Sequence, residues 1–159
     1  MNPTASTRYE YICAEPLALT LRWDGNELAA IALTWARKDF AANPTSPDGR
    51  ALQQALETYV QGKLDTWPNL ALPMHRLTPF RRTVLTELAR VPKGKTLTYG
   101  ELAAKAGSPK ASRAVGQCMA QNPWPLVIPC HRVLGSDGLH GFGPGLEMKE
   151  YLLKLEGAL

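Results

Sequence analysis

The segment Ile128-Pro129-Cys130-His131-Arg132-Val133 holds the residues of this chain that are best suited to chemistry. A cysteine thiolate is a nucleophile, and the positive charges that His131 and Arg132 can carry favour the ionised form. Pro129 fixes the backbone before Cys130. In an extended strand His131 would face away from Cys130, so pairing the two requires a turn or a bridging water. The segment predicts a nucleophile held on a turn, although a free cysteine is more often a small buried apolar residue.

A second candidate group surrounds Arg113, in a stretch with helical spacing. Its neighbours have small side chains, namely Ala111, Ser112, Ala114 and Gly116. A helix with such a face can approach another surface closely, whether that surface is another helix of the same domain or a nucleic acid. Because an arginine suits contact with a nucleic acid better than it suits a core, we favour nucleic-acid binding for this face.

The remaining reactive residues give weaker signals. Cys118 and Met119 are expected to pack in the interior, and His75 and His140 are expected at the surface or in loops. Tyr99 alone is most simply a half-buried core tyrosine that could donate a hydrogen bond to a ligand.

The cysteine pattern bears on compartment and on metals. The three cysteines have no close spacing, which argues against a disulfide framework and indicates a reducing environment. No CxxC or HxxxH pair occurs, so we expect no metal and no cofactor. The first residues lack the pattern of a signal peptide, and no run approaches the roughly 18 apolar residues that span a bilayer. We expect a cytoplasmic protein, in a bacterial cytosol or nucleoid, without membrane contact.

Charge is distributed unevenly along the chain. The net charge is +4, but residues 1–75 carry six basic and eight acidic residues, whereas residues 76–159 carry twelve and six. The basic half is the half that contains Cys130. A polyanion is a natural partner for it, with a solvated basic surface as the alternative.

The first half reads as a sheet followed by a helix. Residues 8–36 alternate in the manner of strands, with a turn at 24–26. A loop is predicted over 43–49. After it, helical spacing joins apolar residues, namely Leu52, Leu56, Tyr59, Val60 and Leu64. Pro68 and Pro73 bracket a connector, so we divide the chain into residues 1–75 and 76–159.

The second half reads as mainly helical. Thr78-Pro79 is typical of a helix start, and Thr98-Tyr99-Gly100-Glu101 is a capping box that opens a short helix ending at Gly107. A second helix is predicted from Ser108-Pro109 to about Ala120, which gives helix-turn-helix spacing. Residues 126–128 are expected to form a short buried strand or extended segment. The fold class is therefore α+β.

A glycine-rich loop and a last helix close the chain. Gly141, Gly143 and Gly145 predict a flexible or tightly turned loop. The last helix follows from Leu146 and has Gly157 at its C-cap.

Taken together, the motifs resemble those of the O6-alkylguanine-DNA alkyltransferases, also called methylated-DNA–protein-cysteine methyltransferases. Five pieces match in order over about residues 78–157. They are Tyr99-Gly100-Glu101-Leu102-Ala103, Arg113-Ala114-Val115-Gly116, Asn122-Pro123, the Cys130 segment, and the tail with Gly145-Leu146, Lys149, Leu152-Leu153 and Glu156-Gly157.

The resemblance implies roles for the matching residues. Cys130 is the alkyl acceptor, His131 takes its proton through a water, and Glu156 polarises His131. Asn122 ties the helix-turn-helix to the active-site segment, and Tyr99 protonates the departing guanine.

Further roles concern the DNA and the base. Arg113 fills the gap left by a flipped nucleotide, and Tyr99 and the small neighbours of Arg113 contact DNA. The Val133 carbonyl, Phe142 and the backbone near Gly143 form the pocket for the base.

The resemblance also implies the fold and the reaction. It implies a ribonuclease-H-like fold for residues 1–75, by analogy, and a winged-helix or helix-turn-helix-like domain for residues 76–159. The reaction is a single, irreversible transfer from O6 of guanine in duplex DNA, by a monomer; the residues leave O4 of thymine open as a second substrate.

The glycine loop departs from the family pattern. It is about one residue short, and Phe142 stands where a tyrosine is common. Pro144 has no N–H, so a backbone donor to O6 must come from Gly143 or Gly145.

Three alternatives stay open at this point. The chain could bind alkylated DNA without transferring the alkyl group, although relatives of that kind replace the cysteine. A transcriptional regulator would use the helix-turn-helix alone. A Cys-His hydrolase would turn over repeatedly.

Overall fold

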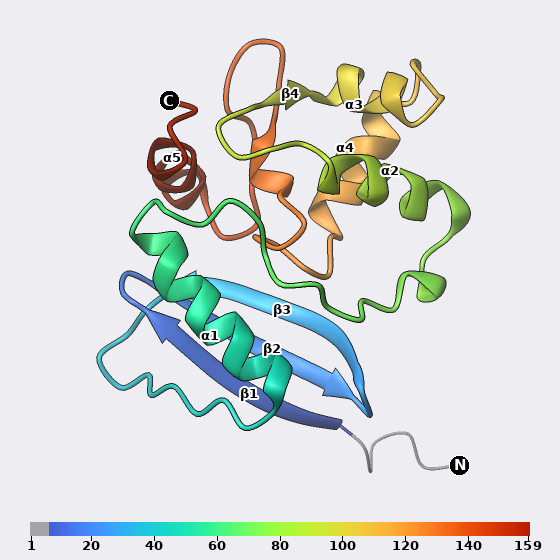
Figure 1. Ribbon diagram of the computed structural model, residues 1–159. Helices are drawn as coiled ribbons and strands as arrows, with labels where there is room; N and C mark the ends of the chain where they lie inside the picture. The colour runs from blue at the N-terminus through green and yellow to red at the C-terminus, as the bar shows by residue number, and fades with distance from the viewer. Residues whose placement is uncertain (1–6) are drawn as a thin grey trace. The chain divides into compact units, whose positions relative to one another are not determined.

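The computed structural model describes residues 7–159 and separates into two compact units, one ending at Pro73 and the other running from Met74 to Leu159 (Figure 1). Each unit combines strands with helices, which confirms the predicted α+β class. No helix within residues 7–159 is both long enough and apolar enough to cross a membrane.

The first unit is an antiparallel meander with one helix on one of its faces (Figure 1). Its strands are β1 (Thr7–Ala14), β2 (Leu17–Asp24) and β3 (Glu27–Trp35), and its helix is α1 (Pro47–Val60). The tight turn between β2 and β3 uses Gly25 at φ +60°, which favours glycine. Leu19, Leu21 and Leu56 are fully buried between sheet and helix. Whether this unit is ribonuclease-H-like stays a prediction.

The helix α1 begins earlier than predicted. The loop expected over 43–49 ends at Ser46, whose side chain accepts a hydrogen bond from the Gly49 N–H and caps the helix. Pro47 then occupies the first helical position, where its missing N–H costs nothing. The helix also ends at Val60, so Leu64 lies outside it.

A buried carboxylate fixes the loop before α1. Glu10 on β1 accepts hydrogen bonds from the backbone N–H groups of Thr45 and Ser46, from the Ser46 hydroxyl and from Arg8. Burial alone would raise the pKa of Glu10, but the hydrogen bonds outweigh it and lower the pKa to about 2. Gly49 leaves room for this carboxylate, because a Cβ there would overlap it.

The second unit is mainly helical. It contains η2 (Met74–Arg76), α2 (Pro79–Ala89), α3 (Tyr99–Lys105), α4 (Ser112–Ala120), the short 3₁₀ turn η3 (Cys130–Arg132) and α5 (Leu146–Leu155). A parallel pair, β4 (Leu97–Thr98) and β5 (Val133–Leu134), joins the segment before α3 to the segment after η3. The predicted N-cap at Thr78 and the capping box of Thr98 and Glu101 are confirmed.

Two predicted elements of this unit are wrong in detail. The helix expected from Ser108 begins at Ser112, because a turn closed by the Ala111 N–H and the Ser108 carbonyl (2.9 Å) precedes it. Residues 126–128 are a turn with Leu126 at φ 77°, closed by the Ile128 N–H and the Trp124 carbonyl (2.9 Å). Flanking prolines at 123, 125 and 129 lack the N–H groups that a strand would need.

The helix α5 turns a lysine inward. Leu146, the first residue of the helix, is 51% exposed, whereas Lys149 is 1% exposed. The C-cap is Glu156 rather than Gly157, and Gly157 follows at φ +79°. A glycine in this conformation ends the helix just after Glu156, which is buried.

Replacing Glu10 with glutamine is expected to lower the free energy of unfolding of the first unit by about 2 kcal/mol at pH 7, since charge-assisted hydrogen bonds are lost. The pKa of Glu10 is lowered from 4.5 to about 2. Its stabilisation is therefore complete above about pH 4.5 and declines as the pH falls toward 2.

Urea unfolding at pH 7 and at pH 3 checks both expectations, because the difference between wild type and Glu10→Gln should shrink in acid. Glu57→Gln, which changes an exposed carboxylate on α1, is the control. An equal loss of stability at the two pH values would contradict the prediction.

Candidate active site

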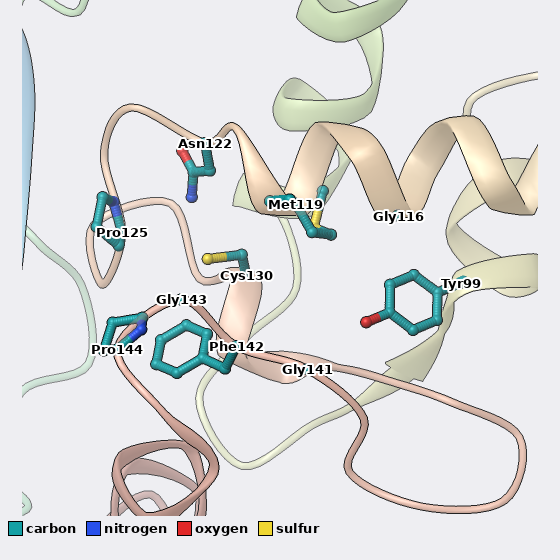
Figure 2. Close-up of a pocket in the computed structure, with 11 residues that line it drawn as sticks. Tyr99, Gly116, Met119, Asn122, Pro125, Cys130, Gly141, Phe142, Gly143 and Pro144 are labelled. Carbon is teal, nitrogen blue, oxygen red and sulfur yellow. The ribbon is translucent and has the colours of Figure 1, made fainter.

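A pocket of about 390 Å³ opens in the second unit (Figure 2). Its walls come from α3, from α4, from the segment that follows α4, from η3 and from the loop before α5. The lining residues are Tyr99, Gly116, Met119, Ala120, Asn122, Pro125, Cys130, Gly141, Phe142, Gly143 and Pro144. Met119 therefore lines the pocket and is only half-buried, in contrast to its predicted place in the interior.

Cys130 begins the turn η3, as the sequence predicted for its backbone. Its N–H donates to the Ile128 carbonyl (2.8 Å), and the Arg132 N–H donates to the Pro129 carbonyl (3.0 Å). The residue is 6% exposed, and its side chain lines the pocket. Figure 2 shows the Asn122 amide nitrogen pointing toward the sulfur, and Tyr99 entering from the opposite side with its hydroxyl turned inward.

His131 follows Cys130 in η3 and pairs with Glu156. The His131 Nε2 and the Glu156 Oε2 are 2.7 Å apart, and both side chains are buried. The other ring nitrogen, Nδ1, is buried without a hydrogen-bond partner among residues 7–159. The pairing of His131 with a carboxylate from the far end of the chain leaves one imidazole nitrogen available to a ligand or a water.

Arg132 holds the same carboxylate from the other side. Its Nε donates to Glu156 Oε1 (2.8 Å) and one terminal nitrogen donates to Oε2 (3.1 Å), while the second terminal nitrogen donates to the Val91 carbonyl (2.7 Å). The sequence indicated Arg132 only as a nearby positive charge, and its contact with Glu156 was not predicted. One signal was available: Arg132 directly follows His131, for which an acidic partner was already expected.

These contacts set the protonation states. Burial alone would raise the pKa of Glu156, but hydrogen bonds from His131 and Arg132 lower it to about 2. Burial lowers the pKa of His131 despite Glu156. The carboxylate can only accept, so a neutral His131 carries its proton on Nε2 and presents a lone pair at Nδ1. The geometry therefore makes Nδ1 a potential base.

The resting state of the thiol differs from the prediction. Burial raises the pKa of Cys130, and a hydrogen bond with Asn122 and the charge of Lys149 oppose this only in part. The prediction that His131 and Arg132 favour a thiolate is wrong, because His131 is held neutral and Arg132 is neutralised by Glu156. The thiol is protonated until a base removes its proton.

Asn122 connects the end of α4 to the Cys130 segment. Its Nδ2 donates to the Ile128 carbonyl (2.9 Å), and its Oδ1 accepts from the Trp124 N–H (3.0 Å). These two bonds close the chain around the buried turn that precedes Cys130. A shift of α4 would therefore be transmitted to the sulfur through this amide.

Lys149 was not proposed as a site residue, yet it contacts the loop that lines the pocket. Its Nζ donates to the Val133 carbonyl (2.7 Å) and to the Gly141 carbonyl (3.4 Å). Burial lowers the pKa of Lys149 to about 8. The buried Lys149 side chain thus joins α5, β5 and the pocket loop. In the sequence, Lys149 stood out only as one residue of the motif in the tail.

Most of the predicted base-pocket residues line the cavity. Tyr99, Phe142 and Gly143 do so, whereas Val133 is fully buried and does not. The Val133 carbonyl is engaged by Lys149, so its predicted contact with a base stays a prediction. Burial, and then the charge of Cys130, raise the pKa of Tyr99, so the phenol keeps its proton and can donate it.

The small-residue face around Arg113 is at the surface. Ser112, Arg113 and Ala114 are exposed, and Ala111 is half-buried. Gly116, three residues after Arg113, lines the pocket. Residues three apart on a helix lie on neighbouring positions of one face, so this exposed surface adjoins the pocket mouth.

Comparison with known proteins covers both units. A family model described as "6-O-methylguanine DNA methyltransferase, DNA binding domain" matches residues 79–158. The chain is 36% identical to a methylated-DNA–protein-cysteine methyltransferase of Haemophilus influenzae over 155 aligned residues. The alignment covers 93% of this chain and 85% of that protein. A protein of the same name from Methanosarcina acetivorans is 44% identical over 110 residues, 69% of each chain.

Solved structures agree with these matches. The crystal structure of Mycobacterium tuberculosis OGT in complex with DNA superposes with a TM-score of 0.80 at 33% identity, covering 94% of this chain and 92% of that chain. The crystal structure of the O6-methylguanine methyltransferase of the same organism gives a TM-score of 0.78 at 32% identity, covering 96% and 93%.

Replacing Lys149 with methionine is expected to raise the pKa of Cys130 further, because a charge that favours the thiolate is removed. Modification of Cys130 by iodoacetamide, read from the mass of its peptide, should slow by about threefold to tenfold at pH 7, where Lys149 is mostly charged. Lys154→Met, at an exposed site on α5, is the control. If the substitution only loosened the loop, the alkylation rate would change at every pH and the midpoint of its pH dependence would stay the same. That outcome would contradict the prediction.

Proposed function

The chain belongs to the 6-O-methylguanine DNA methyltransferase family, and from this membership we propose how its residues perform the reaction. The protein binds DNA and repairs it by moving an alkyl group from the DNA to a cysteine of its own. We propose that the acceptor is Cys130 and that the group comes from O6 of guanine. The observation that carries this proposal is that Cys130 lines a pocket and is followed directly by His131, which is paired with Glu156.

The target base must leave the stacked duplex to reach the sulfur. Unstacking costs a few kcal/mol, and least for a damaged, poorly paired base. We propose that Arg113, exposed one turn from the pocket wall, fills the gap, and that Ala111, Ser112, Ala114 and Gly116 let α4 approach the groove. The extruded base would then enter between Tyr99 and Phe142, near the backbone of Gly143 and the Val133 carbonyl.

Proton movement follows from the protonation states. The neutral thiol gives its proton through a water to Nδ1 of His131, and Glu156 stabilises the resulting imidazolium through Nε2. Because Glu156 is already fixed as an anion by Arg132, the partner charge is in place before the proton moves. Lys149 adds a positive charge that favours the thiolate at the moment of attack.

The transfer itself exchanges one bond for another. The Cys130 Sγ bonds to the alkyl carbon as that carbon's bond to O6 breaks. Tyr99 gives the departing guanine a proton and becomes a phenolate. The proton that His131 took from the thiol then returns to Tyr99 through water, so the net change moves one proton from Cys130 to guanine. The thioether that forms has no ready leaving group, so each molecule acts once.

The two parts of the chain have different proposed roles. We propose that residues 76–159 carry both DNA binding and alkyl acceptance, with residues 1–75 as a separate structural unit. We also propose that the protein acts as a monomer in the cytoplasm, where its three unbonded cysteines stay reduced.

Incubation with a duplex oligonucleotide that contains one O6-methylguanine is expected to add a single methyl group to Cys130 and none elsewhere. Peptide mass spectrometry locates the group, and titration with excess DNA checks that transfer stops at one equivalent. Cys130→Ser should bind the DNA but remain unmodified, while Cys118→Ser, at a buried cysteine of α4, should react normally. Binding without any adduct in the wild type, or continued turnover, would overturn the proposal.

Replacing Arg113 with alanine is expected to slow repair of duplex DNA by about tenfold to a hundredfold, while leaving the reaction with free O6-benzylguanine nearly unchanged. The free base needs no extrusion, so it isolates chemistry from base flipping. Lys110→Ala, which removes another exposed charge near α4, is the control for general loss of phosphate attraction. An equal loss on both substrates would make Arg113 structural.

A further inference from the structure

The segment between β5 and α5 contains a histidine that the proposed reaction does not use. The chain leaves β5, turns back through Gly135 and Gly138, and reaches His140 before the pocket loop begins. The turn is closed by the Gly135 N–H and the Gly138 carbonyl (2.9 Å). His140 is followed directly by Gly141, which lines the pocket. The sequence had suggested only a loop histidine without a partner.

His140 is held in place by its surroundings. The Nε2 of His140 contacts the Asp137 carboxylate, and the two side chains form an ion pair when the imidazole is protonated. The ring packs over Gly135, where a Cβ would lie 2.0 Å from the His140 Cδ2. The backbone of His140 has φ 55°, in the left-handed region that favours glycine. The His140 side chain is half-exposed and Asp137 is exposed, so the contacts with Gly135 and Asp137 orient the ring at the surface of the loop.

The His140 ring contacts Tyr99. The ring centroids of His140 and Tyr99 are 6.2 Å apart at an interplanar angle of 67°, the edge-to-face arrangement that aromatic pairs prefer. Across from Tyr99, Gly116 offers no side chain, and even an added Cβ there would lie 3.9 Å from the phenol ring. No side chain of Gly116 contacts the Tyr99 ring on the α4 side, and the imidazole of His140 contacts the ring edge-to-face.

We propose that His140 is a positioning residue that holds the Tyr99 phenol at the mouth of the pocket, with Asp137 and Gly135 fixing His140. The consequence for the reaction rests on the role proposed above for Tyr99. A phenol that must deliver a proton to the departing guanine has to keep its hydroxyl turned inward, as Figure 2 shows. The turn after β5 brings His140 to this position.

A measurement on the protein alone tests the contact. With ring-labelled tyrosine, the NMR signal of Tyr99, assigned with Tyr99→Phe, is expected to shift in His140→Ala and to return toward the wild-type position in His140→Phe, which keeps an aromatic ring. His75→Ala, at an exposed histidine of the same unit, should leave the signal unchanged. An unmoved Tyr99 signal in His140→Ala would overturn the proposal, whether or not the protein transfers methyl groups.

A double-mutant cycle tests the consequence for transfer. His140→Ala should slow methyl transfer to Cys130 by about threefold to tenfold, and His140→Phe should recover most of the rate. In the Tyr99→Phe background, which has no hydroxyl to position, His140→Ala should have no further effect. Additive losses would show that His140 does not act through Tyr99. Failure of wild-type transfer would instead refute the proposed function, and the NMR result would still decide the contact.

Discussion

The candidate active site depends on one buried carboxylate. Glu156 receives His131 and Arg132, which are adjacent in the turn η3, and Arg132 extends the connection to the Val91 carbonyl. A buried ion pair gives little net stability, but loss of one partner costs about 3–5 kcal/mol because a bare charge is left behind. The carboxylate therefore acts mainly as a constraint. It requires η3 to be a turn, requires α5 to end where it does, and keeps His131 in one tautomer.

This constraint bears on how the Cys130 thiol can stay protonated and unreactive at rest and still be ionised when the substrate is bound. A cysteine that is consumed by one reaction is best left protonated until its substrate is bound, because a standing thiolate would react with other electrophiles. Burial of Cys130 supplies that protection. In the proposed reaction His131 is the base and Lys149 supplies the charge, and both side chains are held by buried hydrogen bonds before the proton moves.

The sequence was most informative where a signal is local. The cap at Thr78, the capping box at Thr98 and the turn at Gly25 depend on residues within a few positions of each other, and all three are present. The boundaries that were missed depend on competition between signals: Ser46-Pro47 reads as a loop or as a helix start. Lys149 could not be placed as a buried side chain, because its partners, the Val133 and Gly141 carbonyls, meet it only after folding.

The family motifs point to the residues that are proposed to react, but they do not describe how the parts of the site are joined. Asn122 links α4 to the turn before Cys130, and Lys149 links α5 to the loop that forms the opposite wall of the pocket. The helix that meets DNA in the proposed reaction is thus bonded to the acceptor segment, and the pocket loop is bonded to the helix that ends in Glu156. Through these hydrogen bonds the docking of α4 proposed above and the position of the sulfur are coupled by covalent neighbours and direct side-chain contacts.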